Sequence, residues 1–174
     1  MNGYIKMDNT EKQRLYDDFY RNPNISEREK YKYYTQNEPS ILEEKQKIRK
    51  IVIEKGLSSV MNDTKWLKLQ SAIEKLPFPP PYIEKLIIED KTFEDVQISD
   101  NPQWLGDWSS FYQEGMYLFF AIEFIKVRPR YAEYIGRLVA PKIFDETEEF
   151  ERLLKELHIP YEEDNGTFTI YGYK

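Results

Sequence analysis

The scarcity of histidine and the absence of cysteine limit the chemistry open to this chain. His158 is its single histidine in 174 residues, and there is no cysteine, which excludes a thiolate nucleophile, a disulfide framework and a thiolate metal site. His158 could act as a lone general base, or its cationic form could stabilise the C-terminus of a predicted helix. A zinc site would need carboxylates for every other ligand. We therefore expect no metal and no other cofactor.

A glutamate in the apolar segment MYLFFAIEFIKV is the main catalytic candidate. A buried carboxyl group at Glu123 would have a raised pKa and, with a second acid such as Asp107, could hydrolyse a substrate. Alternatively, Glu123 pairs with a base such as Lys85 or Arg128. We favour this structural interpretation and predict that the chain is not an enzyme, with a carboxylate-based hydrolase as one alternative.

Aromatic side chains and a carboxylate surround Gly106. Trp104, Asp107, Trp108 and Tyr112 have the composition of a protein-binding hot spot or of a stacking platform for a sugar. Tryptophan is also a large core residue, so burial of Trp108 in a sheet is the other interpretation. A small-ligand or carbohydrate-binding module is therefore the second alternative.

A run of acids follows residue 144. Asp145, Glu148 and Glu149 open the densest part of an acidic stretch that reaches Asp164. Such a surface could bind a basic partner, or the acids could stabilise a helix N-terminus and form a solvated face.

Charge is distributed unevenly along the chain. Residues 1–60 hold 12 basic and 10 acidic side chains, a balance of +2, whereas residues 61–174 hold 13 and 21, a balance of −8. An acidic C-terminal part disfavours direct nucleic-acid binding and favours a basic protein partner. We find no signal peptide and no membrane-spanning run, and expect no membrane association and a cytoplasmic location.

The first 60 residues predict a helical N-terminal extension. Helical periodicity over 10–20, a capping box of Ser26 with Glu29, and a second capping box of Ser40 with Glu43 predict three helices, the last ending at Gly56. Their thin apolar stripes need burial, and formation of a homodimer is one way to provide it.

Residues 61–174 predict an α+β domain with a mainly antiparallel sheet and packed helices. Asn62 or Thr64 is expected to cap a helix that ends before Pro77. Strands are expected over 82–89, 96–99, 108–112 and 116–127. Asp145 with Glu148 predicts a capping box before an amphipathic helix, and Asn165-Gly166 predicts a type I′ hairpin turn between two final strands. Gly136 and Pro141 predict that residues 131–143 are irregular or form a short strand with bends.

Four short motifs suggest a relationship to known sequences. The chain carries Asn62-Asp63-Thr64-Lys65-Trp66, Trp104-Leu105-Gly106-Asp107-Trp108, a long aromatic strand and Ile170-Tyr171-Gly172-Tyr173. Together they resemble a family of small uncharacterised bacterial domains over about residues 61–174, with 1–60 outside the pattern. Members are similar in size and style to immunity proteins of bacterial toxin systems. The resemblance implies a fold boundary more than a mechanism.

These observations favour a non-enzymatic bacterial interaction protein, most concretely an immunity-type inhibitor of a basic toxin. We expect binding through Trp104, Asp107, Trp108 and Tyr112, with Asp145, Glu148 and Glu149 as an electrostatic rim.

Overall fold

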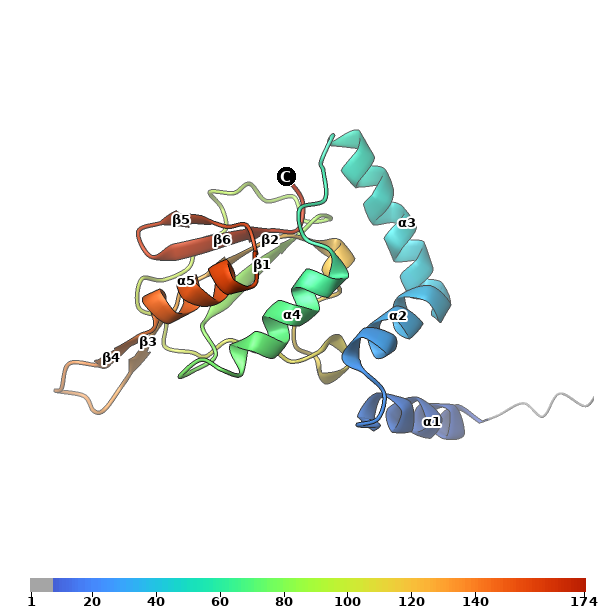
Figure 1. Ribbon diagram of the computed structural model, residues 1–174, viewed down its shortest axis with the longest axis horizontal. Helices are drawn as coiled ribbons and strands as arrows, with labels where there is room; N and C mark the ends of the chain where they lie inside the picture. The colour runs from blue at the N-terminus through green and yellow to red at the C-terminus, as the bar shows by residue number, and fades with distance from the viewer. Residues whose placement is uncertain (1–7) are drawn as a thin grey trace, which may run out of the picture. The chain divides into compact units, whose positions relative to one another are not determined.

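The computed structural model describes residues 8–174, which contain five α-helices and six β-strands (Figure 1). The described chain forms two compact units that divide between Leu42 and Glu43. Helices precede antiparallel sheets, so the predicted α+β class with a helical N-terminal stretch is confirmed. No helix within the described residues is both long and apolar enough to span a membrane.

The first unit is built from α1 (Asn9–Arg21), α2 (Glu27–Asn37) and the start of α3 (Pro39–Glu54). Ser26 and Glu29 form the predicted capping box of α2. Aromatic rings join α1 to α2, with the Phe19 and Tyr33 ring centroids 4.8 Å apart. The predicted capping box at Ser40 is wrong because α3 already begins at Pro39, whose missing N–H costs nothing at a first helical position.

The second unit contains a four-stranded antiparallel sheet. Its strands are β1 (Tyr82–Leu86), β2 (Ile122–Val127), β6 (Thr167–Tyr171) and β5 (Glu162–Asp164), in that spatial order. Asn165 and Gly166 have φ of 50° and 78° and form the predicted turn between β5 and β6. Ser58 and Lys174 exchange backbone hydrogen bonds, so the segment that precedes Met61 is tied to the C-terminal end of this sheet.

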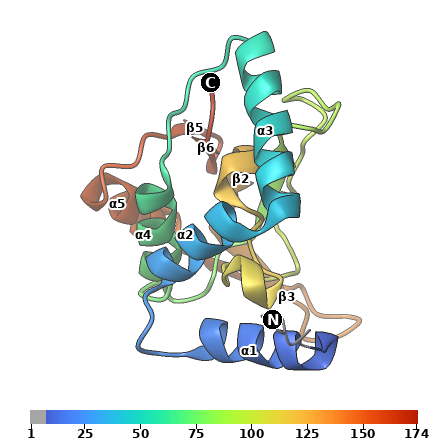
Figure 2. The same cartoon turned by 90° about the vertical axis from the view of Figure 1, so that its right-hand side faces the viewer.

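Helices cover one face of the sheet. Both α4 (Asp63–Ile73) and α5 (Thr147–Glu156) lie on this side (Figures 1 and 2). Asn62 caps α4, as predicted, and Phe150 of α5 meets Phe168 of β6 with ring centroids 5.3 Å apart. The opposite face contacts the loop between β1 and β2, where Phe93 packs on Phe124 at 5.2 Å.

The strands β3 (Arg130–Glu133) and β4 (Lys142–Asp145) form a separate two-stranded hairpin that extends away from the main sheet (Figure 1). Most of the hairpin falls within residues 131–143, where the sequence predicts an irregular segment or a short strand with bends, and the structure has two paired strands instead. The hairpin leads directly into α5, since the backbone N–H of Glu146 donates to the carbonyl of Pro129 at 3.0 Å.

Several predicted elements differ from the structure. Residues 96–99 and 108–112 are not strands; the second range contains instead the start of a short 3₁₀ helix, Phe111–Gln113. The long strand over 116–127 is shortened to β2, because another 3₁₀ turn occupies Phe119–Ala121. Asp145 and Glu148 form no capping box, since α5 begins at Thr147 and Asp145 accepts a hydrogen bond from the Thr147 backbone.

Candidate functional site

The tip of the β3–β4 hairpin exposes an unusual amount of apolar surface. This hairpin tip, residues 134–143, has five large apolar side chains that are at least 39% exposed, and Leu138 is 100% exposed. They are Tyr134, Ile135, Leu138, Val139 and Ile143. Single exposed apolar residues are ordinary, whereas five within ten residues make this segment a candidate interaction surface.

Side-chain contacts between β3 and β4 stabilise the base of the hairpin below its tip. The rings of Tyr131 and Phe144 stack with centroids 6.1 Å apart. Arg130 and Asp145 form an ion pair at 3.3 Å on opposite strands. Although partial burial acts to raise the pKa of Asp145, hydrogen bonds from Thr147 and the charge of Arg130 lower it overall, so this carboxylate is ionised at neutral pH.

A predicted aromatic residue lies on the loop next to this hairpin. The backbone N–H of Ala132 in β3 donates to the carbonyl of Pro102 at 2.8 Å. Trp104 and Leu105 follow two and three residues later and are 43% and 45% exposed. The structure therefore places two more exposed apolar side chains on the segment that flanks β3.

The predicted acidic rim adjoins the other strand of the hairpin. Asp145 ends β4, and Glu148 and Glu149 are exposed in the first turn of α5. We call these three residues the acidic turn. Carboxylates at this position also stabilise the helix, because the N-terminal end of a helix carries partial positive charge.

Trp108, in contrast, lies in the core. Its side chain is 7% exposed, and its indole N–H donates to the carbonyl of Pro80 at 2.8 Å. The ring also packs on Tyr82, with centroids 4.6 Å apart. The interpretation of Trp108 as a core residue is thus the one that the structure supports, and the residue is not available as a surface anchor.

Gly106, between the two tryptophans, permits a close approach of two backbone segments. The backbone N–H of Gly106 donates to the carbonyl of Pro79 at 3.1 Å, and a Cβ atom at Gly106 would collide with the carbonyl of Pro80. The segment around Gly106 is therefore pressed against the proline run that follows α4. This close backbone contact holds the Trp-Leu-Gly-Asp-Trp segment in a position where Trp108 is buried.

The remaining predicted site residues have local roles in the structure. Asp107 is exposed and accepts hydrogen bonds from the backbone and hydroxyl group of Ser109, at 3.0 and 2.5 Å. Tyr112 is half-buried in the 3₁₀ turn, where its ring meets Phe111 edge to face. His158 is exposed just beyond α5, with a φ of 53°.

Glu123 is paired with a base, as its structural interpretation predicts. Its carboxylate forms an ion pair with Lys85, whose side chain is 2% exposed, beside an irregularity in the β1–β2 register. Asp107 belongs to a different hydrogen-bonded group, with Ser109. Within the described residues, no group of three or more His, Asp or Glu side chains could hold a metal ion.

One buried acid was not recognised in the sequence. Glu146 occupies the N-cap position of α5, where its side chain makes no capping hydrogen bond, and it is 1% exposed. Its Oε2 accepts from the Phe78 backbone at 3.2 Å, whereas Oε1 has no hydrogen-bond partner in the described structure. Burial, reinforced by the charges of Glu149 and Asp145, raises the pKa of Glu146 to about 8. Glu146 is therefore largely protonated at neutral pH and adds no charge to the acidic turn.

The hairpin tip was also missed, although a signal exists. The segment YIGRLVAPKI combines apolar residues with Gly136 and Pro141, which disfavour a long regular element. An apolar segment with turn residues but no helical or strand period is the pattern of an exposed apolar loop.

Comparisons with known proteins identify a family for this chain. No curated protein and no solved structure matches the chain. A family match covers residues 48–174 and so begins before Met61, where the motifs of the sequence start. The matched segment includes the hairpin, the Trp104 loop and α5. The chain belongs to the family of unknown function DUF6678.

Proposed function

We propose that this chain is a protein-binding module that docks a basic partner through the hairpin tip and the acidic turn. The observation that carries the proposal is the exposed apolar group of the hairpin tip, with Leu138 fully exposed at its centre. Burial of such side chains against a partner contributes about 25 cal/mol for each Å² of apolar surface removed from water.

The proposed docking surface combines apolar contacts with electrostatic contacts. The hairpin tip and Trp104 supply apolar area, and aromatic and aliphatic anchors of this kind dominate binding energies. The acidic turn lies where the hairpin meets α5 and would attract a basic surface. Charges at the rim of an interface mainly raise the association rate and its dependence on salt.

Charge favours a protein partner over nucleic acid. Residues 61–174 carry a balance of −8, from 13 basic and 21 acidic side chains, and would repel a phosphate backbone. The specific form of the proposal is an immunity-type inhibitor, which would work by covering the functional surface of a basic toxin. Such an inhibitor needs no cofactor and no chemistry of its own.

The test separates the two kinds of contact. Tagged full chain is used to capture proteins from lysate of the source organism at low and high salt, together with Leu138→Asp and a Glu148→Lys, Glu149→Lys double variant. We expect one stoichiometric basic protein to bind the parent chain, to be lost with Leu138→Asp, and to bind the double variant more slowly and with less dependence on salt.

A matched control uses a charge far from the acidic turn in the chain. Lys68→Glu changes an exposed residue of α4 and should leave capture unchanged. Capture that is equal for the parent chain and Leu138→Asp would refute docking through the hairpin tip.

A further inference from the structure

A small polar pocket lies between the main sheet and the loop that precedes β2. Its volume is about 230 Å³, below the roughly 300–1,000 Å³ of sites for drug-sized ligands. Lys126, Thr167 and Thr169 line it from β2 and β6, and Asp164 lines it from the end of β5. Asp100 and Asn165 belong to the loop before β2 and to the β5–β6 turn. The sequence pointed to ligand binding near Trp104 and Trp108, and neither residue lines this pocket.

The pocket contains the buried ammonium group of Lys126, whose positive charge is not neutralised by a carboxylate of the described residues. Lys126 is 6% exposed, and its ammonium group donates to the carbonyl of Phe93 at 2.8 Å and lies 3.6 Å from the centre of the Phe93 ring. Within the described residues, no carboxylate lies within ion-pair distance of Lys126. Burial accordingly lowers the pKa of Lys126, partly offset by the charge of Glu94. A buried charge of this kind is stabilised by an anionic ligand.

Hydroxyl groups beside the lysine add hydrogen-bonding capacity. Lys126 and Thr169 are paired in register on adjacent strands, so their side chains share one face of the sheet. The hydroxyl groups of Thr167 and Thr169 make no hydrogen bond to any other described residue. They can therefore donate to a carboxylate that lies against Lys126.

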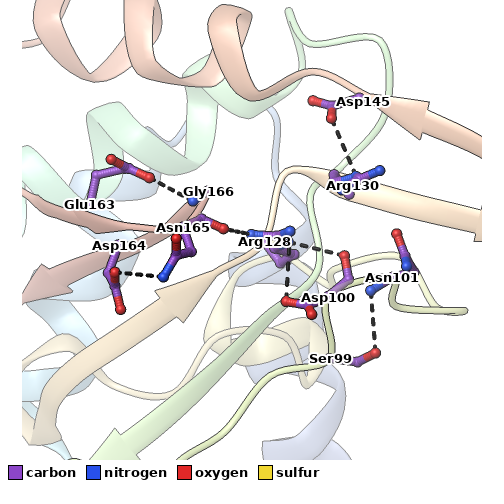
Figure 3. Close-up of polar contacts among 10 residues, drawn as sticks. All are labelled: Ser99, Asp100, Asn101, Arg128, Arg130, Asp145, Glu163, Asp164, Asn165 and Gly166. Carbon is purple, nitrogen blue, oxygen red and sulfur yellow. Dashed lines mark hydrogen bonds and ion pairs between the residues drawn. The ribbon is translucent and has the colours of Figure 1, made fainter.

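The buried guanidinium group of Arg128 links two of the segments that line the pocket. Arg128 is 5% exposed, and its guanidinium group donates to the backbone carbonyls of Asp100, at 3.0 Å, and Asn165 (Figure 3). It also lies 3.7 Å from the carboxylate of Asp100. One side chain thus fixes the loop and the turn relative to each other, and preorganised walls reduce the entropic cost of binding.

The charged side chains around the pocket differ in exposure. Lys126 is buried, whereas Asp164 is exposed and Asp100 is paired with Arg128. These four residues have a formal balance of zero, with two positive and two negative charges. A ligand with a carboxylate at one end and an ammonium group at the other matches both kinds of charge.

We propose that this pocket binds a small zwitterion of the free amino acid class, with its carboxylate on Lys126 and Thr169 and its ammonium group on Asp164. The acids that line the pocket disfavour a polyanion such as phosphate. This site is separate from the docking surface, so it does not depend on the proposed function.

The test is a titration of the full chain followed by ¹⁵N–¹H NMR. The probes are glycine and L-alanine as zwitterions, acetate as a carboxylate alone, methylammonium as an ammonium group alone, and inorganic phosphate. We expect the zwitterions to shift the amide signals of Asn165 and Thr169 in a saturable manner, and acetate, methylammonium and phosphate to bind at least about tenfold more weakly.

Variants assign the two ends of the ligand. Lys126→Met keeps an unbranched side chain of nearly the same length and should weaken zwitterion binding by about tenfold or more, as expected for the loss of a charge-assisted hydrogen bond. Asp164→Asn should weaken glycine binding without changing acetate binding. Lys68→Met, on the exposed surface of α4, is the control and should bind like the parent chain.

Thr169→Val provides an independent test if Lys126→Met does not fold, because it removes only the hydroxyl group from the same wall. The proposal is overturned if glycine produces no saturable shift, if acetate or phosphate binds as tightly as glycine, or if folded Lys126→Met or Thr169→Val binds glycine like the parent chain.

Discussion

The carbonyl of Pro102 accepts a hydrogen bond from the backbone N–H of Ala132 at 2.8 Å. This bond joins the loop that carries Trp104 to the strand that leads to the hairpin tip, although 30 residues separate the two partners in the sequence. It places an exposed tryptophan on the segment beside an exposed apolar hairpin, which is the structural basis of the proposed docking surface.

Leu138 should contribute little to stability, because its side chain is fully exposed. We expect Leu138→Asp to change the free energy of unfolding by no more than about 0.5 kcal/mol. Leu154→Ala, at a position with 0% exposure, should cost about 2–5 kcal/mol. Urea denaturation measures both, and a large loss in Leu138→Asp would show that the tip belongs to the core.

Trp104 and Trp108 should contribute unequally to stability, because only Trp108 is buried. Trp108→Phe removes the donor to the Pro80 carbonyl and should destabilise the fold by about 1–3 kcal/mol. Trp104→Phe, at a 43% exposed position, should lie within about 0.5 kcal/mol of the parent chain. Equal effects in thermal denaturation would contradict the burial of Trp108.

Glu146 should make stability depend on pH. Its pKa of about 8 in the folded protein lies above its ordinary value of 4.5, so its contribution is full below about pH 4.5 and is lost as the pH rises towards 8. The loss has a slope of up to about 1.4 kcal/mol per pH unit.

Glu146→Gln removes this titration while keeping the shape of the side chain. Urea denaturation of both proteins between about pH 5 and pH 8 should show the parent chain losing stability relative to the variant. A constant difference between the two proteins across this range would show that Glu146 is ionised throughout.

The ion pair between Lys85 and Glu123 should behave as a coupled unit. Glu123→Gln leaves the buried ammonium group of Lys85 without its carboxylate, and we expect a cost of about 3–5 kcal/mol. The double variant Lys85→Met, Glu123→Gln should recover part of that cost, since no unpaired charge remains. A double-mutant cycle that gives simply additive costs would contradict the coupling.

Local signals predicted the elements that depend on neighbouring residues. The capping box of Ser26, the amphipathic period of α5 and the Asn165-Gly166 turn each involve residues close in the chain, so the sequence is sufficient to identify them. The predicted strands at 96–99 and 108–112 failed for the opposite reason. Strand-like composition cannot show that Trp108 is held by a carbonyl 28 residues away instead of by a neighbouring strand.

The candidate sites show the same limit. Trp104 and the acidic turn were recognised from residue type, because tryptophan and carboxylate clusters are recognisable without a structure. The hairpin tip was missed because apolar residues are expected inside, and only the register of β3 with β4 places residues 134–143 outside. The pocket at Lys126 requires three segments that Arg128 holds together, and no spacing in the sequence reveals that contact.

The docking proposal is tested most directly by a photo-crosslinking amino acid placed at position 138, with position 68 on α4 as the control. In cells of the source organism, we predict that a basic protein cross-links at position 138 and not at position 68, and that Glu148→Lys with Glu149→Lys reduces its yield. The absence of a cross-linked protein at position 138, or equal yields at the two positions, would contradict the proposed docking surface.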